Sequence, residues 1–341
     1  MSEFIIITWT SASIVGIFLL TAMTGYFFSK SAVSSPEFPK LLSRLVFYIL
    51  LTCLLFTKTE TSITPDNFTR LWLFPAAATV YVMLGLLVGV ITAKILRLKQ
   101  EHIRPVIAVL TFQNSGYLPI SLMATAYTVF PALQAYPQAE SEAIACISSY
   151  LLASALLAWL IGPPLVAGTK LRDFNWRNVV TPPVIGLFAG TAVGLIEPLR
   201  SLLTTTSSPL FPVFGTAELL SKGVIPCVLM LLGASMAGGT KKHGVGAGTV
   251  IVCIVLKLFV MPAIVIGGLY FLSKASLINL SLISILVLVI EGGMPPANNL
   301  VVMSELAGGR SRTELAVLMF WHYLASIISI TLVIATAIYL F

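Results

Sequence analysis

Apolar residues in this chain gather into ten long runs that are separated by short polar connections. A helix that crosses the roughly 30 Å hydrocarbon core of a bilayer needs about 20 residues, which is the length class of these runs. The pattern therefore predicts an all-α polytopic membrane protein with ten transmembrane helices. These cover residues 4–28, 40–58, 70–96, 104–130, 143–168, 179–197, 216–237, 246–272, 277–304 and 313–340.

Composition indicates that the lipid bilayer is the main environment of the chain. Of its 341 residues, 57% are apolar and 10% are charged, and the mean hydropathy is +0.99. So few charged residues cannot form a soluble surface, and the short connections leave no room for a separate soluble domain. The net charge of +7 is therefore interpreted as a sign of orientation in the membrane, and no nucleic-acid partner is expected.

The distribution of basic residues predicts that orientation. Fourteen of the 20 Lys and Arg residues fall at alternate connections, beginning with the first. Because cytoplasmic connections are enriched in Lys and Arg, we expect the odd-numbered connections in the cytoplasm and both termini outside. The fourteen are Lys30, Lys40, Arg44, Lys94, Arg97, Lys99, Arg104, Lys170, Arg172, Arg177, Lys241, Lys242, Arg310 and Arg312.

The polar segment 169–178 divides the predicted helices five and five. An odd number of helices per half inverts the second half, so we expect a first repeat at 1–168 and an inverted repeat at 179–341. An offset of 176 residues aligns the first helix of each half. The same offset pairs Pro36 with Pro212, and Leu118-Pro119 with Met294-Pro295.

Two predicted helices contain clusters that do not suit a continuous membrane helix. The fourth contains the sequence from Gln113 to Pro119, and the ninth contains the sequence from Glu291 to Asn299. Proline removes an amide donor and clashes with the preceding turn, and paired glycines let the backbone leave helical geometry. Freed backbone groups are costly in lipid, so both breaks are expected to face protein or a water-filled cavity.

Broken helices at equivalent places in inverted halves should cross at the membrane midplane, with two helix N-termini directed at one point. Each N-terminus carries about half a positive charge, which suits an anion such as a carboxylate. The alternative is that the prolines only kink the helices and that the polar side chains cap the kinks. The candidate substrate-binding residues are Asn114, Ser115, Gly116, Tyr117, Pro119, Pro295, Pro296, Asn298 and Asn299.

Three ionisable residues are expected inside the membrane. Glu291 lies at the ninth-helix break, where it could carry a coupled proton, bind Na⁺ or cap a helix end. Lys257 lies near the centre of the eighth helix and needs a partner, either Glu291 or the carbonyl ends of the broken helices. His322 stands among aromatic residues, where packing and proton transfer are both open.

Several other classes of protein are disfavoured by the sequence. Both aspartates, Asp66 and Asp173, fall in connections, and no His-Glu-x-x-His motif or phosphate-binding glycine loop occurs. An intramembrane aspartyl or zinc enzyme and an ATP-driven pump are therefore not expected. We expect no enzymatic activity and no cofactor, apart from H⁺ or Na⁺ as a coupling ion. A channel or a membrane sensor on the same fold remains an alternative to a carrier.

The residues at the two breaks resemble motifs of the auxin efflux carrier family. The sequence from Phe112 to Pro119 is similar to that family's fourth-helix motif, an Asn-x-Gly followed by Pro. The sequence from Met294 to Asn299 resembles its ninth-helix motif, and the sequence from Lys257 to Pro262 resembles its Lys and Pro pattern in the eighth helix. Sharp similarity is confined to these three segments, while the ten-helix layout agrees along the whole chain.

The resemblance implies more than the residues alone. It implies a fold similar to that of NhaA and the bile acid sodium symporters, in which helices 3–5 and 8–10 move past a scaffold of helices 1, 2, 6 and 7. A homodimer through the scaffold and a small organic anion as substrate are implied as well. The short central connection differs from the plant members and favours a bacterial carrier of the inner membrane. Glu291 is similar to acids of sodium-coupled relatives, so Na⁺ near Glu291 and Asn298, and Na⁺-coupled uptake of an anionic amphipath, form the second hypothesis.

Overall fold

The computed structural model describes residues 2–31, 33–64, 71–129, 133, 139–168, 180–237, 245–308 and 311–341. Within these ranges the chain is helical and its one β-type pairing is an isolated bridge. The helices are α1 (Ser2–Lys30), α2 (Phe38–Leu45), α3 (Leu51–Ser62), α5 (Leu73–Ile95), α6 (Gln100–Thr111), α7 (Tyr117–Val129), α9 (Ala139–Ala167), α10 (Pro182–Leu195), α11 (Glu197–Thr204), α12 (Phe211–Ser221), α13 (Val224–Ala237), α14 (Ala247–Val255), α15 (Met261–Lys274), α16 (Leu282–Gly292), α17 (Asn299–Leu306) and α18 (Arg312–Leu340).

A helix occupies most of each of the ten predicted ranges. In the described part, six helices are long and apolar enough to cross a membrane, and a bent pair could form one more span. The prediction of a polytopic helical membrane protein is therefore confirmed at this level. The six are Phe38–Thr61, Leu73–Ile95, Glu142–Ala167, Phe211–Ala234, Ala247–Lys274 and Arg312–Leu340.

The bent pair departs from the predicted sixth helix. Helices α10 and α11 meet at an angle of 106°, because Ile196 leaves helical geometry at φ −109° and ψ 93°. Pro198 then lies in the first turn of α11, where a missing amide donor costs nothing. Glu197 and Pro198 interrupt the apolar run at this point, so the predicted sixth helix ends at the bend, while the hydropathy pattern does not predict the short helix α11 that follows it.

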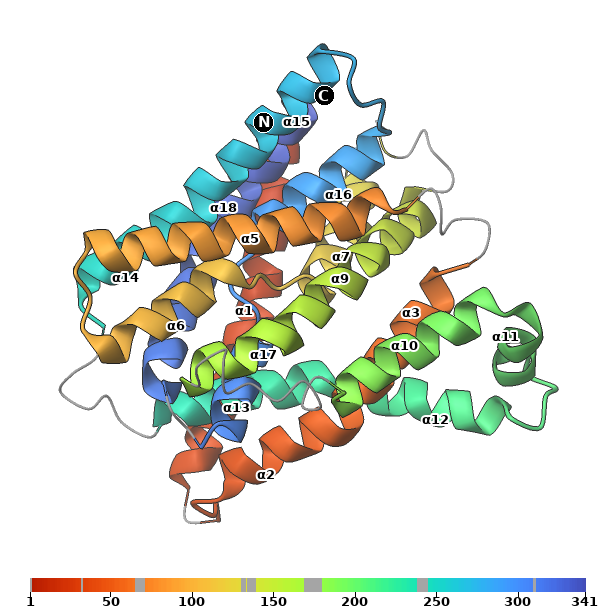
Figure 1. The fold of residues 1–341 in the computed structure, drawn as a ribbon, viewed down its shortest axis with the longest axis horizontal. Helices are drawn as coiled ribbons and strands as arrows, with labels where there is room; N and C mark the ends of the chain where they lie inside the picture. Colours follow the sequence, from red (N-terminus) through yellow and green to blue (C-terminus); the bar gives the residue numbers. More distant parts are fainter. Residues whose placement is uncertain are drawn as a thin grey trace.

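The helices form two groups (Figure 1). Helices α3, α10, α11 and α12 lie together at one side of the molecule, while α5, α14, α15 and α16 lie at the opposite side. The most extensive contacts between helices join α1 to α13 and α3 to α10. Both contacts connect segments that are far apart in the sequence.

Glycines make these two contacts close. On α10, Gly186, Gly190 and Gly194 recur every four residues, and a Cβ on Gly190 would lie 2.2 Å from the carbonyl oxygen of Phe56 on α3. A Cβ on Gly233 of α13 would lie 1.7 Å from the carbonyl oxygen of Ala22 on α1. Small residues at such spacing let the backbones of membrane helices touch. The two contacts therefore leave no room for a side chain.

We expect Gly190→Ala to destabilise the protein by about 1–3 kcal/mol, because the new methyl group forces α10 away from α3. Thermal unfolding of the purified protein measures the change. Gly267→Ala is the matched control, since a Cβ there meets nothing within 4 Å, and it should stabilise helix α15 by up to about 1 kcal/mol. Equal stability of the two variants would contradict the close contact.

Candidate functional site

Two helices are interrupted where the sequence predicts it. Helix α6 ends at Thr111 and α7 begins at Tyr117, and helix α16 ends at Gly292 while α17 begins at Asn299. Phe112 is extended at φ −101° and ψ 128°. Pro295 and Pro296 have no amide hydrogen and therefore cannot continue the hydrogen bonds of α16. Each interruption leaves a short segment whose polar backbone groups need partners.

The two interruptions provide those partners for each other. The amide of Asn114 donates to the carbonyl of Pro295 at 2.8 Å, and the amide of Ala297 donates to the carbonyl of Phe112 at 3.1 Å. Gln113 and Pro296 face each other in an antiparallel bridge. The interrupted segments thus cross as a short two-stranded pairing, which satisfies backbone groups that would be costly to bury alone.

Neighbouring helices support the ends of both first half-helices. The Lys257 ammonium group donates to the carbonyl of Leu110 in α6 at 3.0 Å, and the Tyr81 hydroxyl donates to the carbonyl of Leu288 in α16 at 3.2 Å. Both side chains are buried. Carbonyl groups near a helix C-terminus carry partial negative charge and favour such donors. Of the two partners that the sequence leaves open for Lys257, the structure has the backbone carbonyl.

One hydroxyl group fixes two asparagines beside the crossing. Tyr323 of α18 accepts a hydrogen bond from Asn114 Nδ2 at 2.8 Å and donates to Asn298 Oδ1 at 2.6 Å. The carbonyl of Pro296 lies 3.1 Å from the same hydroxyl. The amide group of Asn298 therefore has its oxygen occupied and its NH₂ group available, and Asn114 keeps one N–H hydrogen for another acceptor.

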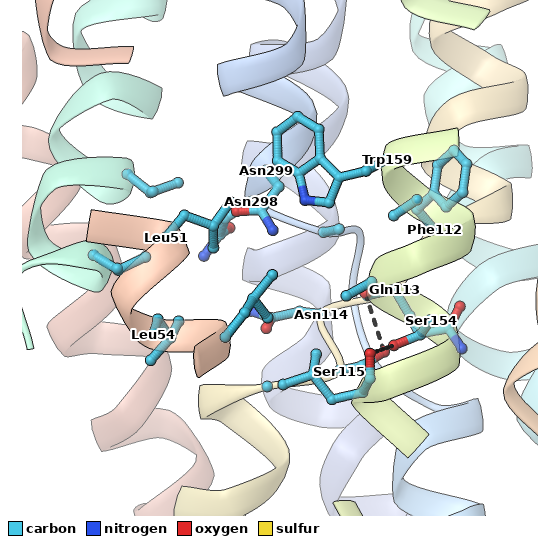
Figure 2. A pocket seen from close by; sticks show the side chains of 18 of the residues that line it. Leu51, Leu54, Phe112, Gln113, Asn114, Ser115, Ser154, Trp159, Asn298 and Asn299 are labelled. Atoms are coloured by element: carbon cyan, nitrogen blue, oxygen red, sulfur yellow. Dashed lines mark hydrogen bonds between the residues drawn. The ribbon is translucent and has the colours of Figure 1, made fainter. Parts of the chain in front are cut away.

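A cavity of about 100 Å³ lies against the crossing. Figure 2 shows Asn114, Asn298 and Asn299 beside it, with Leu51 and Leu54 of α3 on the opposite wall. Among the predicted residues, Asn114, Ser115, Gly116, Asn298 and Asn299 line the cavity. Pro119, Pro295 and Pro296 do not line it and are buried, and the side chain of Tyr117 lies outside the described part.

The electrostatics of the cavity depend on the helix starts. Its lining contains no Lys, Arg, Asp or Glu among the residues that the structure describes. Gly116 directly precedes α7, and Asn298 and Asn299 form the start of α17. The opposite wall is apolar and consists of Leu51, Leu54 and Leu55 of α3, Val224, Ile225 and Val228 of α13, and Trp159 of α9. The first N–H groups of a helix have no partner within it, so helix starts at one wall and hydrocarbon at the other suit an anion with an apolar body.

Glu291 is fully buried behind the crossing and does not line the cavity. Neither of its carboxyl oxygens has a hydrogen bond within normal geometry to the described residues. The Ser115 side chain and the phenol groups of Tyr81 and Tyr150 surround it closely enough to interact electrostatically. Gln113 donates to the Tyr150 hydroxyl, and its own Oε1 has no partner there. Ser115 and Gln113 therefore stand between Glu291 and the cavity.

His322 is fully buried on α18. Its Nδ1 donates to the carbonyl of Leu318 in the same helix at 2.6 Å. Its side chain does not line the cavity. This geometry brings His322 next to the framework of the crossing and not to the asparagines.

Several residues of the site are not apparent in the sequence. Tyr323, Tyr150 and Trp159 are aromatic residues within apolar runs, where packing is the usual role. The role of Tyr81 could have been found from the repeat, because Tyr81 precedes Lys257 by 176 residues, which is the offset that relates the two halves. The same offset fails at the breaks, where Pro119 lies in the first turn of α7 while Pro295 lies in the extended segment.

These observations define a class: a polytopic helical membrane protein with two interrupted helices paired beside a cavity. Comparison with known families gives the same answer from the sequence. A model described as "Membrane transport protein" matches residues 10–168 and 168–334, and the chain belongs to this family, which is that of the auxin efflux carriers. The predicted resemblance is thereby confirmed, and the family is a class of transporters and not of enzymes.

Relatives occur in plants and archaea. Protein PIN-LIKES 5 of Arabidopsis thaliana is 24% identical, covering 85% of this chain and 87% of the relative. Protein PIN-LIKES 3 of the same plant is 21% identical over 94% of this chain and 95% of its own length. An uncharacterized transporter of Methanocaldococcus jannaschii is 23% identical over 86% of this chain and 88% of its own.

Tyr323→Phe tests the role of the hydroxyl that joins Asn114 and Asn298. We expect a loss of about 1–3 kcal/mol in the free energy of unfolding, because two half-buried amide groups lose a partner. Thermal unfolding gives the change. Tyr339→Phe is the control, since Tyr339 is 89% exposed, and it should change stability by less than about 0.5 kcal/mol. A Tyr323→Phe variant as stable as this control would show that the hydroxyl does not hold the crossing.

Proposed function

We propose that this protein is a secondary or facilitative transporter of a small organic anion and that it binds the anion in the cavity beside the crossing. The observation that carries the proposal is that the residues at the starts of α7 and α17 line one cavity together with Asn114. Two helix starts offer about one positive charge in total, without a cationic side chain. A carboxylate is the simplest group that fits them.

The orientation of the asparagines supports an anion. Because the Tyr323 hydroxyl fixes the oxygen of Asn298, the NH₂ group of Asn298 is available to a ligand, and Asn114 adds another N–H donor. Hydrogen bonds from neutral donors to a carboxylate are stronger than bonds between neutral groups. The apolar wall of α3 and α13 fits the hydrocarbon part of the same molecule. Aliphatic monocarboxylates, dicarboxylates and indole acids of the auxin type are the candidate substrates.

The transport movement is proposed to be of the elevator type. In this proposal, ten spans form two inverted repeats, residues 1–168 and 179–341, which 169–178 connect. Helices α1–α3 and α10–α13 form a scaffold, and α5–α9 and α14–α18 carry the crossing from one face of the membrane to the other. The close glycine contacts α1–α13 and α3–α10 support a rigid scaffold. We further propose a homodimer through the scaffold in a bacterial inner membrane, with both termini outside.

Glu291 is proposed as the site of ion coupling. A fully buried carboxylate without a cationic partner among the described residues is costly by several kcal/mol, so the group requires a proton or a cation. Ser115 links it to the cavity, since Ser115 lines the cavity and lies next to the carboxyl group. The oxygen atoms of Glu291, Ser115 and Gln113 favour Na⁺-coupled uptake of an anionic amphipath as the second candidate function.

Ligand binding by the purified protein tests the anion site. We expect thermal stabilisation by at least one member of a panel of acetate, succinate, benzoate and indole-3-acetate. Asn114→Ala and Asn298→Ala should each weaken that binding about tenfold or more, the equivalent of losing a hydrogen bond to a charged group. Thr79→Ala on an exposed face of α5 is the control and should bind normally.

The result also separates the competing functions. Stabilisation that is unchanged in both asparagine variants would place the anion elsewhere and contradict the proposed site. If no carboxylate stabilises the protein with or without Na⁺, a channel or a sensor becomes the better hypothesis. Counterflow of labelled substrate in proteoliposomes supports a carrier, whereas large unitary currents support a channel.

Glu291→Gln tests the coupling proposal. The dependence of anion binding on pH or Na⁺ should be about fivefold or more in the native protein and should disappear in the variant, because Gln can neither ionise nor attract a cation. Melting temperature should change little, since Glu291 forms no ion pair with the described residues.

Glu60→Gln is the matched control for this experiment. Glu60 is another buried glutamate, but its Oε1 lies 3.3 Å from Arg200 Nε. Loss of that pair should lower stability by about 1–3 kcal/mol and leave the ion dependence intact. If Glu291→Gln binds anions with native pH and Na⁺ dependence, Glu291 has no role in coupling.

A further inference from the structure

A second and larger pocket lies between α3 and the helices α12 and α13. Its volume is about 510 Å³. Leu54 and Ile225 line both this pocket and the cavity beside the crossing. The two spaces are therefore neighbours that share these two apolar side chains. The other lining residues are Thr57, Lys58, Thr61, Phe214, Glu218, Ser221, Lys222 and Pro226.

The charged side chains of this pocket have an excess of positive charge. Lys222 Nζ lies 3.4 Å from Glu218 Oε1, one turn away on the same helix, and both side chains are more than half exposed. Lys58 has no acidic partner within salt-bridge distance among the described residues. Glu60, two residues after Lys58, is paired with Arg200. One uncompensated ammonium group thus remains beside polar Thr57 and Thr61.

We propose that this pocket is the external vestibule of the carrier and that Lys58 captures the carboxylate of the substrate there before it passes Leu54 and Ile225. The inference rests on the proposed function, because it assigns an access route to the same anion site. Lys58 lies near the C-terminal end of α3, which leads into a connection that the distribution of basic residues places outside. The inner cavity has no cationic side chain of its own, so the vestibule supplies the long-range attraction.

The expected effect is on the rate of access. A positive charge in a pocket with low-dielectric walls raises the local concentration of anions and their rate of entry. The effect of exposed charges falls as salt increases, with a screening length of about 10 Å at 0.1 M. Removal of Lys58 should therefore slow the entry of anions and accelerate the entry of cations. It should leave a reagent without charge unaffected.

Labelling of an introduced cysteine measures this effect without any knowledge of the substrate. Thr61→Cys is placed in a full-length chain in which Cys53, Cys146, Cys227 and Cys253 are changed to Ala, and intact cells are treated with membrane-impermeant thiosulfonates. We expect the anionic sulfonatoethyl reagent to react faster than the cationic trimethylammonium reagent, relative to their rates with a free thiol. Lys58→Gln should reduce this preference about threefold or more, which is a small part of the range known for electrostatic steering.

Lys274→Gln is the matched control for charge on the same side of the protein. The ammonium group of Lys274 lies over the ring of Tyr270, at 5.6 Å from its centroid, and does not line the pocket. This variant should keep the preference for the anionic reagent.

A second labelling position is available if Thr61→Cys lowers the melting temperature. Thr57 lies one turn earlier on the same pocket wall, and Thr57→Cys then repeats the measurement.

A second cysteine tests the connection between the two spaces. Ser154 lines the inner cavity, so Ser154→Cys should react with the anionic reagent from outside. Ile225→Trp should slow that reaction severalfold by filling the passage, while the reaction of Thr61→Cys should continue. Failure of Thr61→Cys to react from outside, an unchanged preference in Lys58→Gln, or reaction of Ser154→Cys that Ile225→Trp does not slow would each overturn the vestibule.

These outcomes are distinct from failure of the proposed function. If the asparagine variants bind carboxylates normally, the anion site is wrong whatever the labelling shows. If the asparagine variants lose carboxylate binding while Lys58→Gln leaves the charge preference of Thr61→Cys labelling unchanged, the proposed anion site is supported and the proposed vestibule is wrong. Labelling by charge preference therefore tests the vestibule independently of the substrate.

Discussion

The structure depends on one constraint, which is that an interrupted helix within a lipid-embedded bundle must find partners for its freed backbone groups. Two interruptions solve this together, because Phe112 and Asn114 exchange hydrogen bonds with Pro295 and Ala297. The pairing needs an extended segment from each half of the chain. A single interruption would leave the same groups without partners in an apolar environment. The pairing also fixes the place at which two helix starts meet.

The helices and both breaks could be predicted from the sequence because their signals are local. Apolar runs of sufficient length give the helices, and Gly292, Gly293 and the prolines give the breaks. Glu197 and Pro198 end the apolar run at the bend, but helix α11 and its angle of 106° to α10 could not be predicted, because they are set by contacts beyond that run. The lining residues of the candidate site were partly predicted, with Asn114, Asn298 and Asn299 among them.

The partners of these residues could not be predicted, because they are set by contacts between distant segments. Tyr323 belongs to an apolar helix and gives no sign in the sequence that it bonds two asparagines. The sequence predicted that Lys257 needs a hydrogen-bond partner. That this partner is the carbonyl of Leu110 follows from the packing of α6 beside Lys257. The 176-residue offset between the two halves was a partial guide to these partners. It relates Lys257 to Tyr81, which supports the other broken helix, yet it does not align the prolines at the breaks.

The chemistry of the two halves differs where their backbone roles agree. A cationic side chain supports the end of α6, and a neutral phenol supports the end of α16. Of the two breaks, the one after α16 has a buried acid, Glu291. This acid lies behind Ser115, which belongs to the break between α6 and α7. A repeated framework thus holds groups that are not repeated. In the proposed function, one side of the crossing binds the anion while the other side receives the proton or cation.

The distribution of hydrogen bonds is consistent with movement of the crossing as a unit. The bonds that hold the asparagines come from Tyr323 of α18, and those that support the broken helices come from α5 and the segment of Lys257. Helix α3 is bonded instead to α10 and α11, through Thr59 to Leu187 and Glu60 to Arg200. Toward the cavity, α3 and α13 present apolar side chains. Apolar contacts are non-directional, so the proposed elevator movement, in which the polar wall slides along the apolar wall, breaks none of the hydrogen bonds named above.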